Sequence, residues 1–138
     1  MAISREIGLK FTLCYAHLGL ARLACLQGHY AQSHSILKEA LLLSQDMGAD
    51  WAFAFVLETN ACAAAGQGSH ETAAALWGAA ARLREMVGAP LPQAYADIYQ
   101  PFEAAARNGM GEAAFTTAWQ RARQFPSPGV LELAQGLT

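Results

Sequence analysis

The sequence predicts an all-α domain of about seven helices, built from stacked helical hairpins. Strong helix formers (Ala, Leu, Glu, Gln, Arg) dominate, and no segment alternates polar and apolar residues in the period-2 pattern of a strand. The length of 138 residues fits one domain that buries roughly two-thirds of its unfolded surface. Glycine and proline interrupt the chain at helical intervals, at Gly28, Gly48, Gly66 with Gly68, Gly88 with Pro90, Gly109 with Gly111, and Pro126 with Pro128.

The first two helices are expected to form a hairpin. The first should run from about Ser4 to Leu26, and the second from about Tyr30 to Met47, with Gly48 as its C-terminal stop. The second helix carries apolar residues on two flanks, which indicates burial on two sides, as in a layered stack.

The third and fourth helices should form a second hairpin. Asp50 is a suitable N-cap for the third helix, which should end near Ala65. Ser69 is a suitable N-cap for the fourth, with Glu71 in its first turn, and Gly88 should end it. We therefore expect two hairpins over residues 4–87.

Residues 92–136 are expected to form C-terminal capping helices. Pro92 suits the first turn of the fifth helix, and Pro101 should kink that helix or split it near Gln100. The sixth helix should run from Gly111 to about Arg123. In the last, Ser127 should cap, Pro128 should start the helix, and it should fade at Gly136.

The two predicted hairpins share a residue pattern. The first has Gly28-His29-Tyr30 followed by Ser33, Leu37, Ala40 and Leu41, and about forty residues later come Gly68-Ser69-His70 followed by Ala73, Trp77, Ala80 and Ala81. This order resembles the tetratricopeptide repeat, in which small residues lie where helices cross and large ones fill the gap to the next repeat. Several positions depart from that motif, namely Ala21, Gln45, Asn60-Ala61 and His70. The repeats are therefore degenerate.

The second half of the chain has a more particular resemblance. Its ordered motifs are Leu76-Trp77-Gly78-Ala79-Ala80, Gly88-Ala89-Pro90-Leu91-Pro92 and Gly111-Glu112-Ala113-Ala114-Phe115. This order is similar to the C-terminal tetratricopeptide-like region of bacterial LuxR-type (MalT-like) transcriptional regulators and related signal-transduction ATPases. The resemblance implies a sensor or scaffold segment that binds a protein or small ligand and restrains an NTPase. No Gly-x4-Gly-Lys-Ser/Thr loop or basic recognition helix is present, so we expect a fragment or short relative of such a regulator.

Composition limits the partners and the compartment. The net charge of −2 gives no steering toward nucleic acid, and we expect no direct nucleic acid contact by this segment. Charged residues make up 14%, against about 25% in a typical soluble domain. We therefore expect alanine-rich helices that pack closely in a layered stack, and flanking domains or a second copy that cover part of the surface.

Cysteine usage and hydropathy bear on location. Cys14, Cys25 and Cys62 lack the spacing of a disulfide framework, which indicates a reducing, cytoplasmic compartment. The apolar stretch 7–26 carries Lys10 and Arg22, which disfavour a membrane span.

No catalytic, cofactor or metal residues are expected. Cys14 and His17, three residues apart, can share a helix face with Cys25, His29 and Cys62 nearby, but these spacings match no zinc pattern. The glutamates are too scattered for a di-iron bundle. Trp77 and Trp119 are expected in the core, and Trp51 is expected to pack against the preceding hairpin.

The candidate partner-binding surface is the concave groove lined by the first helix of each hairpin. By repeat position, Tyr15, Leu18 and Arg22 line it from the first hairpin, and Phe55 and Glu58 from the second. An aromatic ring beside an arginine and a glutamate suits a peptide or small ligand. The alternative is that the groove holds the next helix or a second copy of the chain.

These observations predict a non-catalytic interaction or ligand-sensing domain of a bacterial regulatory protein. Two alternatives remain: a self-associating, homodimeric scaffold, and a small helical enzyme or metal-binding protein.

Overall fold

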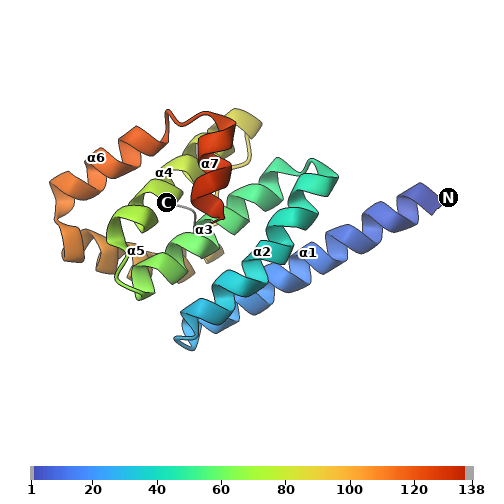
Figure 1. The fold of residues 1–138 in the computed structure, drawn as a ribbon, viewed down its shortest axis with the longest axis horizontal. Helices are drawn as coiled ribbons and strands as arrows, with labels where there is room; N and C mark the ends of the chain where they lie inside the picture. The colour runs from blue at the N-terminus through green and yellow to red at the C-terminus, as the bar shows by residue number, and fades with distance from the viewer. Residues whose placement is uncertain (1, 136–138) are drawn as a thin grey trace.

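The protein is an all-α domain, as predicted. The computed structural model describes residues 2–135, with side chains except those of residues 2–4, 7, 127 and 128. Over this range the chain forms seven helices and no strand (Figure 1): α1 (Ala2–Leu26), α2 (Tyr30–Met47), α3 (Asp50–Gly66), α4 (His70–Val87), α5 (Gln93–Met110), α6 (Glu112–Ala122) and α7 (Ser127–Ala134).

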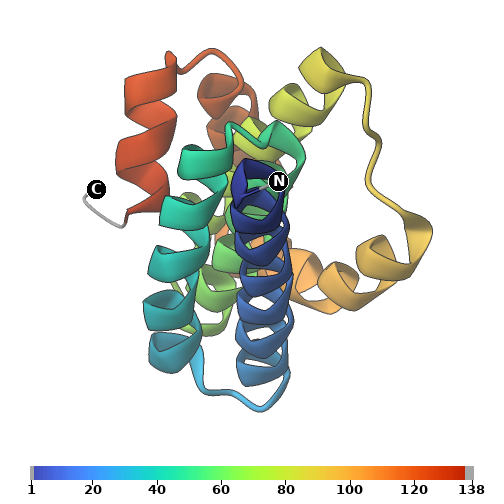
Figure 2. The same cartoon turned by 90° about the vertical axis from the view of Figure 1, so that its right-hand side faces the viewer.

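The first four helices stack in chain order as two hairpins, and the last three pack back on them. α1 and α2 form one antiparallel hairpin and α3 and α4 a second, with α2 and α1 both packed on α3. α5 packs on α3 and α4, α6 packs on α4, and α7 returns to contact α4 and α3. α1 therefore lies at one edge of the fold, where its N-terminal end projects away from α4–α7 (Figures 1 and 2).

Glycine ends several helices as predicted. Gly48 and Gly88 are the C-caps of α2 and α4, with φ values of 61° and 68°, in the left-handed region that a side chain disfavours. The predicted N-caps are less accurate. Asp50 is the first residue of α3, and Ala49 takes the N-cap position. Ser69 does precede α4, but its side chain makes no capping hydrogen bond.

The C-terminal helices correct two predictions. α5 continues through Pro101, so of the two predicted effects of this proline the split near Gln100 is wrong, whereas the kink stays a prediction. Proline removes one hydrogen bond of the helix, and here its ring is exposed while Tyr99 and Ala106 anchor the helix in the core on either side. α7 begins at Ser127 itself, with Pro126 at the N-cap position; the predicted end at residue 136 lies outside the described residues.

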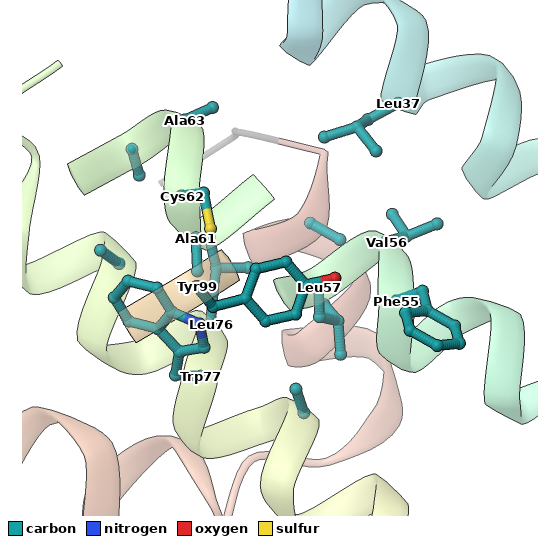
Figure 3. Close-up of a cluster of buried hydrophobic side chains, with 14 of the residues drawn as sticks. Leu37, Phe55, Val56, Leu57, Ala61, Cys62, Ala63, Leu76, Trp77 and Tyr99 are labelled. Carbon is teal, nitrogen blue, oxygen red and sulfur yellow. The ribbon is translucent and has the colours of Figure 1, made fainter. Parts of the chain in front are cut away.

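The centre of the core is α3. Every residue from 54 to 65 is buried, and five of the twelve are alanine, which allows neighbouring helices to approach closely. Figure 3 shows Leu57 and Cys62 of this helix together with Leu76, Trp77 and Tyr99. Trp77 is in the core as predicted.

Trp119 is only partly buried, so its predicted core position is half correct. A Cβ on Gly78 would collide with the backbone carbonyl of Trp119. Gly78 therefore allows the close crossing of α4 and α6.

One packing contact recurs at the start of the second helix of each hairpin. A Cβ on Gly66, at the end of α3, would collide with the ring of Tyr30 at the start of α2. A Cβ on Gly109, near the end of α5, would collide in the same way with the ring of His70 at the start of α4. The predicted correspondence of Tyr30 and His70 thus has a packing counterpart, although tetratricopeptide membership stays a prediction.

Candidate interaction site

Five aromatic side chains from α1, α3 and α5 form a continuous series, here called the aromatic row. Phe11 and Tyr15 of α1 both contact Trp51 of α3, with ring centroids 5.0 Å and 5.4 Å away. Trp51 lies 6.4 Å from Phe55, and Phe55 lies 4.9 Å from Tyr95 of α5 in an edge-on arrangement. Aromatic pairs at these distances contribute about 0.5–1.5 kcal/mol each beyond burial. Trp51 thus packs on the preceding hairpin, as predicted.

Two arginines cover rings of the aromatic row. The Arg22 guanidinium lies 4.5 Å from the centroid of Tyr95, and that of Arg84 lies 4.6 Å from the centroid of Phe55. These distances fit cation–π contacts. The inner half of the row is therefore shielded, whereas Phe11 and Tyr15 remain 43% and 47% exposed.

A buried ion pair lies beneath the row. Arg84 of α4 donates from Nε to Oε2 of Glu58 at 2.6 Å and from Nη2 to Oε1 at 2.8 Å. The third arm of the guanidinium donates from Nη1 to the carbonyl oxygen of Ala89 at 3.0 Å. Both side chains are almost fully buried. Arg84 therefore ties α3, α4 and the 88–92 connector together.

Burial shifts the proton affinities around this pair. It raises the pKa of the Glu58 carboxyl, and the Arg84 guanidinium offsets part of that rise. Burial also raises the pKa of Tyr99 to about 12, against the lowering effect of nearby Thr59 and Arg22. The Tyr99 hydroxyl, the Thr59 hydroxyl and Nε of Arg22 are buried without a hydrogen-bond partner of good geometry.

Residues of the 88–92 connector, which Figure 2 shows as a wide loop between α4 and α5, line two hollows. One has a volume of about 460 Å³, and its lining includes Glu58, Trp77, Arg84, Leu91, Glu103 and Trp119. The other has a volume of about 450 Å³, and its lining includes Phe11, Met47, Trp51, Val87 and Ala89. The exposed end of the aromatic row forms a wall of the second hollow.

The structure brings most of the predicted groove residues together, but it buries three of them. Tyr15 is exposed and Arg22 half-buried, as a contact surface requires. Leu18, Phe55 and Glu58 are only 1%, 7% and 3% exposed, so the expectation that they line an open groove is corrected. The cause is that α2 covers the buried face of α1, while α4 and α5 close over α3.

The side chains that cover these residues were not predicted from the sequence. Arg84 and Tyr95 come from helices that the repeat pattern assigns no role in the groove. A signal for Arg84 was present: it lies seven residues after Trp77, on the buried face of α4. A charged residue on such a face needs a buried partner, and Glu58 is on the neighbouring helix.

The described side chains form no group of three or more His, Cys, Asp and Glu residues placed to hold a metal ion. Cys14, Cys25 and Cys62 are free and buried, and burial raises the pKa of each thiol. All three belong to the hydrophobic core.

Within residues 2–135, one helix, α1, contains a stretch long and apolar enough to cross a membrane by length and composition. The stretch is Gly8–Leu26, and only about a quarter of it is buried in the domain. Of its five buried residues, Cys14, Leu18, Ala21 and Cys25 form one face against the core, and the fifth is Ala24.

No protein-family model matches the chain, and neither a curated protein nor a solved structure matches it significantly. The similarity to LuxR-type regulators therefore stays a prediction from the sequence motifs.

Proposed function

We propose that this chain is a non-catalytic interaction domain of a bacterial regulatory protein, in which the exposed end of the aromatic row binds a segment of a partner protein. The observation that supports the proposal is the row itself: Phe11 and Tyr15 expose large rings beside Trp51 and the 450 Å³ hollow. Aromatic and arginine side chains dominate the binding energy of most protein interfaces.

The chemistry of the surface favours a particular kind of segment. Arg22 lies beside the row on Tyr95 and takes part in none of the ion pairs among the described side chains. An acidic residue of the partner would pair with it. The partner segment therefore carries an aromatic or aliphatic anchor for the hollow and a carboxylate for Arg22.

The regulatory role rests on the LuxR-type resemblance and on the rigidity of the site. Glu58 and Arg84 hold α3, α4 and the connector in one arrangement. A segment that binds a rigid platform shifts a larger regulator between states by its difference in affinity for those states. The three free cysteines favour a cytoplasmic location.

A fluorescence screen tests the proposal. In a variant with Trp77→Phe and Trp119→Phe, Trp51 is the remaining tryptophan and reports on the row. We expect fluorescence titrations with a library of 15-residue acidic-aromatic peptides to give binders at micromolar concentration. We also expect Tyr15→Ala or Arg22→Gln to weaken them roughly tenfold or more.

The matched control is Leu42→Ala, which removes a 56% exposed apolar side chain from α2, away from the row. Binders that respond equally to Leu42→Ala and Tyr15→Ala would show that the row has no special role. A library without binders would remove the proposal.

A further inference from the structure

A different face of α1 carries an exposed apolar stripe, here called the α1 seam: Leu9, Leu13, Ala16, Leu20 and Leu23. The four leucines are 59%, 40%, 55% and 49% exposed, and Ala16 is exposed as well. Isolated exposed leucines are ordinary on a protein surface. Five apolar residues in one line along a helix at the edge of the fold are not.

The spacing of the α1 seam is four, three, four and three residues. This is the heptad spacing by which one helix packs against another helix. A helix that lies on a lipid surface needs a broader apolar face flanked by cations. Here Lys10 is already paired with Glu6 and Asp46. Arg5, one turn before Leu9, continues the line of the seam and does not flank it. The pattern favours a single helix as the occupant.

The α1 seam reads the same in both directions about Ala16: Leu, Leu, Ala, Leu, Leu. A two-fold symmetric contact requires a surface that is complementary to itself. In an antiparallel pair centred on Ala16, Leu9 faces Leu23 of the other copy and Leu13 faces Leu20. The two small Ala16 side chains meet at the crossing point, where they permit close approach of the helix axes.

Charge and area also fit a second copy. With a rise of ~1.5 Å per residue, the antiparallel arrangement separates the two Lys10 side chains by roughly 18 Å along the axis, so they do not repel strongly. The seam with its flanking side chains would bury on the order of 1,000 Å² in total, which is the low end for specific interfaces. The dimer should accordingly be reversible, with a dissociation constant of ~1–100 μM.

We infer that this chain self-associates through the α1 seam, as an antiparallel α1–α1 pair with its two-fold axis at Ala16. Tyr15 and Arg22 lie roughly 120–140° around the helix from the seam, at 100° per residue, so they stay accessible in the dimer. The inference does not rest on the proposed peptide-binding function. An experiment that contradicts self-association leaves the peptide-binding proposal standing, and the reverse also holds.

Sedimentation equilibrium on the full chain between 1 and 500 μM tests the inference. We expect a reversible shift from one to two times 14.7 kDa. Leu13→Glu and Leu20→Glu should each raise the dissociation constant by roughly 100-fold or more, because each places a charge in both halves of the pair. Leu42→Glu is the matched control, since Leu42 is equally exposed but lies on α2; it should leave the dimer unchanged.

Circular dichroism must show the same helicity and melting temperature for all three variants, because every substituted side chain is exposed. Orientation is tested by disulfide cross-linking of Leu9→Cys mixed with Leu23→Cys. The mixture should cross-link between unlike chains much faster than either variant alone.

Three outcomes would overturn the inference: a monomer up to 500 μM, a dimer insensitive to both seam substitutions, or fast cross-linking of Leu9→Cys to itself. Sedimentation of the monomer with phosphatidylglycerol–phosphatidylcholine vesicles, lost in Leu20→Glu, would instead assign the α1 seam to a lipid surface.

Discussion

The buried pair of Arg84 and Glu58 is the feature whose loss should be most costly. Arg84→Met keeps the length of the side chain but leaves the Glu58 carboxylate buried without its guanidinium partner. Removing one partner of a buried pair typically costs about 3–5 kcal/mol. For a domain of this size the expected fall in melting temperature is roughly 10–20 °C.

The stability lost in Arg84→Met should be larger at high pH than at low pH. Burial already raises the pKa of Glu58, and without Arg84 it should rise further. A group whose pKa is higher in the folded state stabilises the fold while it is protonated, below its unfolded pKa. That contribution is lost as pH rises through the folded value. Arg84→Met should therefore be closer to the parent protein at pH 5 than at pH 8.

Urea unfolding followed by circular dichroism at 222 nm measures both effects. The second variant, Glu58→Leu with Arg84→Met, replaces the pair by apolar side chains and should recover most of the loss, because no charge is then left unpaired. Glu58→Leu is measured as the second single variant. The described role of the pair would be contradicted if Arg84→Met lowers the free energy of unfolding by less than ~1 kcal/mol, or if the double variant loses as much stability as the two single variants added together.

Three further predictions concern the core. Gly78→Ala should destabilise the fold by about 1–3 kcal/mol in thermal unfolding, since its Cβ would collide with the backbone of Trp119 in α6; an unchanged melting temperature would contradict the close crossing. The Cys62 thiol should react with Ellman's reagent at pH 8 only as fast as the domain unfolds, because burial raises its pKa and excludes the reagent. Tyr99→Phe should leave stability within about 0.5 kcal/mol or raise it, because neither Thr59 nor Arg22 beside the hydroxyl forms a hydrogen bond of good geometry with it; a loss above ~1.5 kcal/mol would show that one of them does.

Local signals predicted the helices accurately. Breaks at Gly28, Gly48, Gly68 and Gly88 placed the ends of the first four helices within about two residues, because positive φ angles at these glycines are a local property of the chain. Pro101 shows the limit of this reasoning. Its tendency to break a helix was overcome by packing on both sides, which is not visible in a short window of sequence.

The candidate site was predicted only in part, because its decisive contacts join distant positions. Glu58 and Arg84 are 26 residues apart on different helices, and Tyr95 reaches Phe55 only because α5 folds back on α3. A repeat pattern assigns a residue to a face of its helix. It does not say whether a later helix will cover that face, so Phe55 and Glu58 were placed on the correct side but expected to be open.

The buried state of α3 has a consequence for how the domain comes apart and how it changes in evolution. In an ideal repeat array each unit touches its neighbours alone, so units unfold one by one and can be gained or lost by duplication. Here α3 contacts α1, α2, α4, α5 and α7, and Asn60 donates a hydrogen bond from its amide to the carbonyl of Ala134 at the far end of the chain. Unfolding any neighbour exposes part of the same helix. The domain should therefore melt in one cooperative transition and tolerate substitutions better than the insertion or deletion of a whole hairpin.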